Sequence, residues 1–223
     1  MKYTLILILC FFLSFIDAQK CGCSKNLKLK NLISCKPAQF QNGAKVFWEY
    51  DCNTSWITFQ NRNIKRKIFE LEKDFIELSG RLGYRNWTEY KKSFLIENSI
   101  VSGCCQPGEY ILYDKNNGRK IADLGSIIFI SKYKNIPYTI TLKTNSKLLY
   151  TNLNSSKSYP INIPKDKIEK TLKSAHEFYP ENLFENIKIK NNILYIQLRY
   201  KVSKKAHWKI ENITMNVKNA NHY

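Results

Sequence analysis

Residues 110–125 read "YILYDKNNGRKIADLG", and this segment gives the clearest indication of a β fold. Two runs with strand-like composition flank a short polar segment, "DKNNG". The carboxylate of Asp114 can accept a hydrogen bond from the backbone two residues on, and Gly118 supplies the left-handed conformation that a turn needs before the return strand. The stretch therefore predicts an antiparallel hairpin.

Short runs of the same kind continue on both sides of this hairpin. They recur about every ten residues between Asn, Ser and Pro breaks, which is typical of antiparallel meanders. They are "SFLIENSIV" (93–101), "SIIFIS" (126–131), "YTITLK" (138–143) and "KLLYTNL" (147–153), and Pro160 and Pro164 are expected to close the series. The predicted fold class is mainly β, with antiparallel meander sheets in a sandwich or an incomplete propeller-like arrangement and one or two short helices.

The N-terminal half carries a second hairpin signal. Asn42 and Gly43 both tolerate the positive φ that a type I′ turn requires, and a β-branched and aromatic run follows them. Residues 55–71 are predicted to form two strands around a polar connection at residues 61–65. The spacing of apolar residues then allows a strand into Leu71 and at most a short helix after it.

The C-terminal part contains the clearest helix pattern and a last hairpin. Asp166 is the expected N-cap, with Glu169 three residues later as in a capping box. In the hairpin, a turn at Asn191 and Asn192 would pair Ile187 with Ile196, Ile189 with Leu194 and Lys188 with Tyr195.

The first residues have the layout of a secretory signal peptide. Lys2 precedes an apolar run at residues 5–16, and the small residue Ala18 follows it. The run is shorter than the roughly 20 residues that span a bilayer as a helix. We therefore expect residues 1–18 to be a signal peptide and residues 19–223 to be a single disulfide-supported β-rich domain, secreted or periplasmic, with no transmembrane segment.

The cysteines that remain after signal removal are expected to form disulfides, because an exported chain meets an oxidising compartment. They are Cys21, Cys23, Cys35, Cys52, Cys104 and Cys105. The preferred pairing links Cys35 to Cys52 and ties Cys21 and Cys23 to Cys104 and Cys105. A vicinal disulfide between Cys104 and Cys105 is the alternative, and thiolate metal binding or redox chemistry are competing interpretations. No metal or other cofactor is predicted.

The charge balance favours an anionic partner. The chain has 36 Lys and Arg residues against 18 Asp and Glu residues, a net charge of +18. Such a field concentrates polyanions near the surface. However, Lys, Asn, Ile and Tyr are abundant together, as AT-rich codons would also produce. Arg, which recognises bases and phosphates with defined geometry, is scarce, so no specific nucleic acid is predicted.

The best candidate binding surface lies on the last predicted hairpin. Alternation along residues 194–202 separates Leu194, Ile196, Leu198, Tyr200 and Val202 from the opposite face. That opposite face would carry the basic and aromatic residues Lys188, Lys190, Tyr195, Arg199 and Lys201. Such a face can stack on and neutralise a polyanion, although an ordinary solvent-facing sheet of a Lys-rich protein has the same composition.

No catalytic motif is recognisable. The three histidines lie outside the sequence contexts of known metalloprotease and serine hydrolase motifs. The acidic group Glu70, Glu72, Asp74 and Glu77 is more typical of a solvated face than of a paired-carboxylate site. We therefore expect a non-enzymatic binding or interaction module for an anionic polymer or another protein. The alternative is an extracellular or envelope hydrolase whose site is assembled from residues distant in sequence. The oligomeric state is not predicted.

Overall fold

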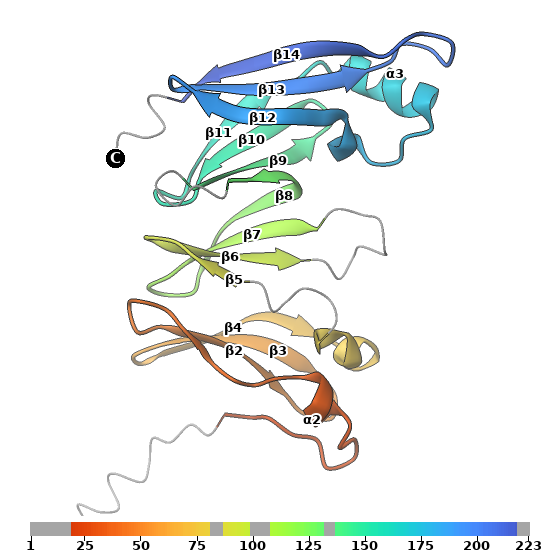
Figure 1. The fold of residues 1–223 in the computed structure, drawn as a ribbon. Coiled ribbons are helices and arrows are strands. Elements are labelled where there is room, and N and C mark those ends of the chain that lie inside the picture. The colour runs from red at the N-terminus through yellow and green to blue at the C-terminus, as the bar shows by residue number, and fades with distance from the viewer. Residues whose placement is uncertain (1–18, 81–86, 99–107, 132–136, 218–223) are drawn as a thin grey trace, which may run out of the picture.

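The computed structural model describes residues 19–80, 87–98, 108–131 and 137–217. In this part of the chain the secondary structure is mainly antiparallel β-sheet, with two short α-helices and two 3-10 helices. The sheets follow one another along the chain as layers of a stack (Figure 1). The mainly β prediction is confirmed, and the arrangement is sandwich-like.

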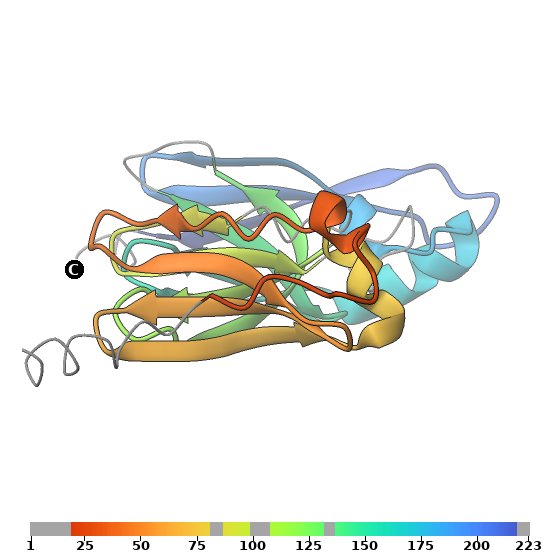
Figure 2. The same cartoon turned by 90° about the horizontal axis from the view of Figure 1, so that it is seen from below.

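The first sheet has the strand order β1-β2-β3-β4. Its strands are β1 (Ala38–Gln39), β2 (Lys45–Tyr50), β3 (Ser55–Asn61) and β4 (Ile64–Leu71). Helix α2 (Leu29–Leu32) precedes the sheet and a 3-10 helix (Lys73–Gly80) follows it, and the two lie together at one end (Figure 2). The two strands predicted within residues 55–71 and the short helix predicted after Leu71 are therefore confirmed.

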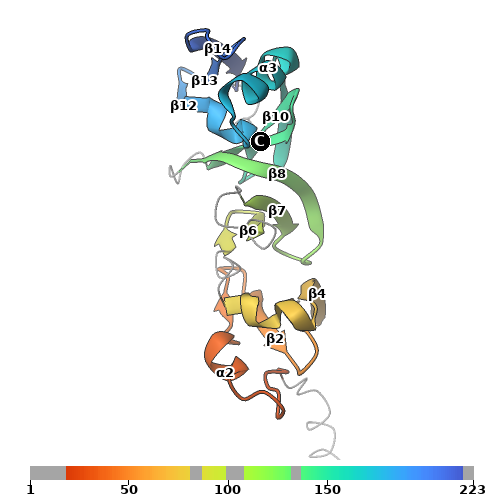
Figure 3. The ribbon, with the colours of Figure 1, turned by 90° about the vertical axis from the view of Figure 1, so that its right-hand side faces the viewer.

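The second sheet is a continuous meander in which each strand pairs with the next. Its strands are β5 (Trp87–Glu89), β6 (Ser93–Asn98), β7 (Glu109–Asp114), β8 (Lys120–Ile130), β9 (Tyr138–Thr144), β10 (Lys147–Asn152) and β11 (Lys157–Asn162). The run predicted as a separate strand at residues 126–131 belongs to β8. The chain bends there without leaving the sheet, because Gly125 takes a φ of +81°. Figure 3 shows β8 curving from the lower layers toward the upper ones.

The third sheet closes the other end of the stack, in the order β12-β13-β14. Its strands are β12 (Phe184–Lys190), β13 (Ile193–Tyr200) and β14 (Lys209–Asn216). Helix α3 (Lys165–Ala175) and a 3-10 helix (Pro180–Leu183) connect it to the second sheet. Strand β14 was not predicted from the sequence.

Separate hydrophobic clusters hold the layers together. The first lies between the first sheet and β6–β7, where the ring of Phe94 stacks on Phe59 and on Tyr113 with centroids 5.7 and 5.2 Å apart. The second joins β9–β11 to the third sheet and α3, with Tyr150 and Ile168 fully buried. A third, smaller cluster contains residues of β6, β7 and β8 together with Leu153. Each sheet face that meets another layer is therefore apolar, as the hydrophobic effect requires.

The hairpin predicted at residues 110–125 forms as expected. The Asp114 Oδ1 accepts hydrogen bonds from the backbone N–H groups of Asn116 and Asn117, at 2.7 and 3.1 Å. Gly118 has a φ of +68°, and a Cβ at this position would overlap the ring of Phe59. The turn is therefore fixed by the Asp114 side chain and by the close packing of Gly118 on Phe59 of the first sheet.

The turn at Asn42 and Gly43 differs from the prediction. Of these two residues, Gly43 alone has a positive φ, of +85°. The Asn42 Oδ1 accepts a hydrogen bond from the Ala44 N–H at 3.2 Å, and the first strand pair across the turn is Gln39 with Lys45. The hairpin forms, but with a longer loop than a type I′ turn, because the Gly43 N–H donates to the Phe40 carbonyl at 2.9 Å and the Phe40 N–H donates to the Ala44 carbonyl at 2.8 Å.

Two predictions between residues 157 and 170 are wrong. Pro160 does not close the strand series, because it lies inside β11. Strand β11 is at the edge of the second sheet, where proline is tolerated because its position does not need an N–H for pairing. Asp166 is not the N-cap of α3. The helix follows Pro164, which makes no side-chain capping hydrogen bond. Asp166 lies in the first turn of the helix, where its Oδ2 is 3.8 Å from the Lys170 Nζ.

The last hairpin has the predicted turn and most of the predicted register. Asn191 and Asn192 both have positive φ, and Ile189 pairs with Leu194 and Lys188 with Tyr195. A register shift between Glu185 and Lys188 removes the expected pairing of Ile187 with Ile196. The strand also ends at Tyr200, so Lys201 and Val202 lie beyond it, and Val202 is exposed.

The predicted disulfide pairing is wrong for the cysteines that the structure describes. Cys21 bonds to Cys35 with Cα atoms 6.3 Å apart, and Cys23 bonds to Cys52 with Cα atoms 4.7 Å apart. The reason is that the N-terminal segment lies along β2: Cys21 forms a parallel bridge with Tyr50, and the Tyr50 N–H donates to the Lys20 carbonyl at 3.0 Å. Cys104 and Cys105 lie outside the described residues.

The described residues contain no helix long and apolar enough to span a bilayer. The predicted signal peptide, residues 1–18, lies outside them.

Candidate binding face of the third sheet

Four of the residues predicted to bind lie on the third sheet, at the top of the stack in Figure 1, and Lys201 directly follows β13. Along β13, Leu194, Ile196 and Leu198 are buried against the second cluster, while the side chains between them are partly exposed. The alternation predicted from the sequence is therefore present. The side of the sheet that carries Tyr195 and Arg199 faces away from the stack and is called the outer face below.

Strand register places the outer-face residues in rows across the three strands. Lys188, Tyr195 and Thr214 form one row. Lys190, Ile193 and Asn216 form the neighbouring row, next to the Asn191–Asn192 turn. Lys188 and Lys190 are both exposed. This end of the outer face therefore presents two ammonium groups beside one tyrosine ring.

Amide side chains occupy the middle of the outer face. The Asn186 Nδ2 donates to the Gln197 Oε1, and the Gln197 Nε2 donates to the Asn212 Oδ1 at 3.2 Å. Asn186 lies in the irregular part of β12 and has a φ of +52°. These cross-strand bonds hold the three strands together. Glu185 pairs with Gln197, so this polar band between the two ends of the face also carries one carboxylate.

The other end of the outer face combines cations with exposed apolar groups. The Arg199 guanidinium carbon lies 4.6 Å from the centre of a Trp208 ring, and the Lys201 Nζ lies 6.0 Å from it. Trp208 is 43% exposed, and Ile210, which pairs with Arg199, is 57% exposed. Both cations lie within the range of a favourable cation–π contact.

Helix α3 fixes the backbone of Lys201. The Lys201 N–H donates to the Thr171 Oγ1 at 2.9 Å, and the Thr171 hydroxyl donates to the Lys167 carbonyl at 2.7 Å, with the Lys201 carbonyl 3.2 Å away. Thr171 itself is fully buried. The backbone of Lys201, at the start of the connection between β13 and β14, is therefore anchored to the core.

Four of the five predicted binding residues lie on the outer face, and the placement of Lys201 on this face is wrong, because β13 ends at Tyr200. Lys188, Lys190 and Tyr195 lie at one end, while Arg199 and Lys201 lie at the other. Tyr195 and Arg199 are four residues apart on β13, which corresponds to about 13 Å along a strand. Sequence reasoning missed Trp208 and Ile210. The polar residues Asn212, Thr214 and Asn216, alternating with Ile213 and Met215, were the available signal for β14.

The outer-face cations keep their charges unpaired. Within the described part of the chain, none of Lys188, Lys190, Arg199 and Lys201 makes an ion pair. Glu211, the acidic residue of β14, lies on the inner side. It binds the Lys167 Nζ at 2.8 Å, and this hydrogen bond raises the pKa of Lys167. The positive field of the outer face is therefore available to a partner.

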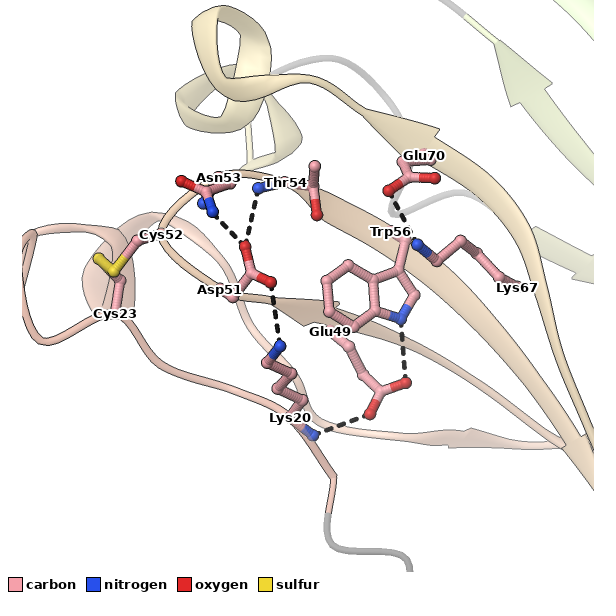
Figure 4. Close-up of polar contacts among 10 residues, drawn as sticks. All are labelled: Lys20, Cys23, Glu49, Asp51, Cys52, Asn53, Thr54, Trp56, Lys67 and Glu70. Carbon is pink, nitrogen blue, oxygen red and sulfur yellow. Dashed lines mark hydrogen bonds and ion pairs between the residues drawn. A yellow bond between two sulfur atoms is a disulfide. The ribbon is translucent and has the colours of Figure 1, made fainter.

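A second polar cluster lies on the first sheet around Trp56 (Figure 4). The Lys67 and Lys20 ammonium groups lie 4.5 and 5.8 Å from the ring centre of Trp56. Lys67 is paired with Glu70 at 2.8 Å, and Lys20 with Asp51 at 3.0 Å. Unlike the cations of the outer face, those of the Trp56 cluster are already neutralised by neighbouring carboxylates.

Glu49 is the buried centre of the Trp56 cluster, with an exposed fraction of 2%. Its Oε1 accepts from the Lys20 N–H at 2.8 Å, and its Oε2 accepts from the Trp56 Nε1 at 3.1 Å and from the Thr58 hydroxyl. Burial alone would raise the pKa of Glu49, but these hydrogen bonds and the charge of Lys65 outweigh it and lower the pKa. The carboxylate is therefore held ionised and fully engaged in structural contacts.

Among the described residues, no three His, Cys, Asp or Glu side chains lie close enough together to hold a metal ion. No protein-family model matches the chain, and no similar sequence was found among curated proteins. The function must therefore be inferred from the surfaces that the fold presents.

Proposed function

We propose that the protein is an exported, non-enzymatic binding module whose outer face on the third sheet binds an anionic polymer. The observation that carries the proposal is the unpaired Arg199 guanidinium stacked on the exposed Trp208 ring, with Lys201 beside it. Aromatic and cationic groups side by side on an open sheet are the combination that binds charged polymers through stacking and charge neutralisation.

The spacing of the cations favours an extended ligand over a small anion. Rows on one face of a strand repeat about every 6.6–6.8 Å, so the two cationic groups are about 13 Å apart with the amide band between them. A small anion could contact one group only. A polymer with repeated negative charges could contact both groups and hydrogen-bond to the amides between them.

A hydrolase is the alternative class, and the described residues favour it less. A hydrolytic site needs a carboxylate or nucleophile that is free to react in a cleft. The most buried carboxylate, Glu49, already accepts three hydrogen bonds, and the predicted acidic member Glu70 is paired with Lys67. The outer face is an open sheet surface, which suits binding.

Export is supported by two independent features. Residues 1–18 have the pattern of a signal peptide, and the two disulfides near the start of the described chain would persist in an oxidising compartment. Both are compatible with a secreted or a periplasmic protein.

The proposal is tested with heparin as a polyanionic probe, by isothermal titration calorimetry at two salt concentrations. Loss of one stacked, charged contact lowers affinity by about a factor of ten, so Arg199→Gln should weaken heparin binding about tenfold. The matched control is Lys36→Gln, which removes one exposed positive charge far along the chain and should change the affinity less than about twofold. Circular dichroism checks that both variants keep the wild-type melting temperature.

Equal losses in Arg199→Gln and Lys36→Gln would contradict the proposal, because they would show that net charge alone attracts heparin. Trp208→Ala provides the second comparison. It retains every charge, so a loss of affinity in this variant identifies stacking at the outer face, whereas unchanged affinity argues against it.

A further inference from the structure

A cavity opens where the tips of three hairpins meet, at one end of the first and second sheets. Figure 1 shows these hairpins in the two lower layers of the stack. The volume of the cavity is about 450 Å³, within the range of small-molecule sites. It is lined by Asn42 from the loop before β2, by Asn116 from the turn between β7 and β8, and by four consecutive residues of the β3–β4 hairpin, Asn61, Arg62, Asn63 and Ile64.

Hydrogen bonds between the hairpins fix the walls of this hairpin-tip cavity. The Asn42 Nδ2 donates to the Lys115 carbonyl at 2.9 Å, and the Asn61 Nδ2 donates to the Asn116 carbonyl, also at 2.9 Å. Lys115 is buried and forms an ion pair of 2.8 Å with Glu89 of β5. Segments that are far apart in the sequence are therefore held in one arrangement before any ligand arrives.

Two of the lining side chains are not used by the fold. Arg62 and Asn63 are exposed, and neither side chain makes a hydrogen bond or ion pair within the described residues. The amide nitrogen of Asn116 is likewise without an acceptor in that part of the chain, although its Oδ1 lies 3.4 Å from the Asn42 Nδ2. The cavity thus presents a free guanidinium and free amides.

The backbone at Arg62 is strained. Asn61 pairs with Ile64, so Arg62 is the first of two central turn residues, and its φ is +50°. Glycine is favoured where the first central residue alone has a positive φ, because a side chain adds a steric cost. A side chain kept in such a position marks a candidate functional residue. Here Arg62 is one of the residues that line the cavity.

We propose that the hairpin-tip cavity binds a sugar acid, that is, a hydroxylated ring carrying one carboxylate. The Arg62 guanidinium has the planar fork that matches a carboxylate. The side chains of Asn63 and Asn116 offer the donors and acceptors that hydroxyl groups need. Ile64, which is 39% exposed, provides an apolar surface for the C–H groups of the ring.

The lining distinguishes this ligand from other anions. Its six residues include one cation, which matches a single negative charge, and four amides, of which those of Asn63 and Asn116 can bind hydroxyls. It contains no aromatic side chain on which a nucleobase could stack. The site lies on different sheets from the outer face and does not depend on the function proposed for that face.

The test measures binding of D-glucuronate and D-galacturonate to the full mature chain by NMR titration, with glucose and acetate as partial ligands. Arg62→Gly removes the guanidinium and relieves the backbone strain, so it should keep or raise the melting temperature while weakening binding at least tenfold. Arg119→Ala is the matched control, because it removes an exposed arginine from the neighbouring turn outside the cavity lining. It should leave binding within about twofold.

The expected result also includes shifts of the Asn63 and Asn116 side-chain amide signals on adding either sugar acid, and much weaker binding of glucose and of acetate. Tighter binding of an oligogalacturonate than of its monomer would identify the end of an acidic polysaccharide as the source of the ligand. Equal or tighter binding of the monomer would identify a free sugar acid. The proposal is overturned if neither sugar acid binds, if glucose binds as well as they do, or if Arg62→Gly and Arg119→Ala behave alike.

Discussion

Replacing Glu49 by Gln is expected to lower the free energy of unfolding at pH 7 by about 3 kcal/mol, because a buried carboxylate here satisfies three donors at once. An amide has one acceptor oxygen where the carboxylate has two. Its NH2 group must therefore face at least one of the donors, which are the Lys20 N–H, the Trp56 Nε1 and the Thr58 hydroxyl.

The magnitude follows from these contacts. Hydrogen bonds to a charged acceptor contribute about 1.5–3 kcal/mol each, against about 0.5–1.5 for neutral ones, so two retained bonds weaken by about 1 kcal/mol each. One donor loses its partner, which costs about 1–3 kcal/mol. Relief from burying a charge at 2% exposure offsets part of this sum. The net loss is therefore about 3 kcal/mol, and Lys65, 3.6 Å away, loses its ion-pair partner as well.

The Glu49 carboxylate also makes the stability difference between wild type and Glu49→Gln depend on pH. The folded-state pKa of Glu49 is lowered by its hydrogen bonds and by Lys65 despite burial, so the ionised form stabilises the fold above the unfolded-state pKa, about 4.3. This contribution is lost as the pH falls through the folded-state pKa. The gap between wild type and Glu49→Gln should therefore be full at pH 7 and shrink progressively below about pH 4.

Urea unfolding of the oxidised protein, followed by tryptophan fluorescence at pH 7, 5, 4 and 3, measures this gap. Glu70→Gln is the control, because Glu70 is 43% exposed and its ion pair with Lys67 should contribute less than about 1 kcal/mol. The reasoning is refuted if Glu49→Gln costs less than about 1 kcal/mol at pH 7, if Glu70→Gln costs as much, or if the gap is the same at pH 7 and pH 3.

Two further changes test the core and the disulfides. Tyr150→Phe should raise the free energy of unfolding by about 1 kcal/mol, because the Tyr150 hydroxyl is buried without a hydrogen-bond partner among the described residues and its burial raises its pKa to about 12. Urea unfolding measures this gain, and a loss of stability would show that the hydroxyl has a partner. Replacing Cys23 and Cys52 together by Ser should cost about 3–4 kcal/mol, because their disulfide closes a loop with a sequence separation of 29. Non-reducing peptide mapping of the wild type checks the connectivity, and a Cys35–Cys52 peptide would contradict it.

Local chemistry determined which parts of the fold could be predicted. The turn at Asp114 was predictable because one side chain accepts both turn N–H groups, and the partner residues lie within the same five-residue segment. The β13 alternation was predictable because each second residue is buried. Strand β14 was missed because Ile210, an apolar residue, lies on the exposed side and interrupts the alternation at its start.

The parts that could not be predicted depend on contacts between distant segments. The disulfide partners follow from residues 20–22 lying along β2, and nothing near Cys21 or Cys23 in the sequence specifies that position. The hairpin-tip cavity joins three turns whose tips meet only after the first and second sheets stack. A sequence pattern reports periodicity within one element, so it cannot report which turns become neighbours.

The positions of the two proposed sites make them separable by experiment. Arg62 lies at the tip of a hairpin whose strands pack on the first hydrophobic cluster, whereas Arg199 lies on the sheet that packs on the second. Substitutions far apart with no shared partner have additive effects within about 0.3–0.5 kcal/mol. In the double variant Arg62→Gly/Arg199→Gln, the loss of heparin affinity should therefore equal that of Arg199→Gln alone, and the loss of glucuronate affinity should equal that of Arg62→Gly alone. A loss of heparin affinity greater than about twofold in Arg62→Gly alone would show instead that one ligand contacts both regions.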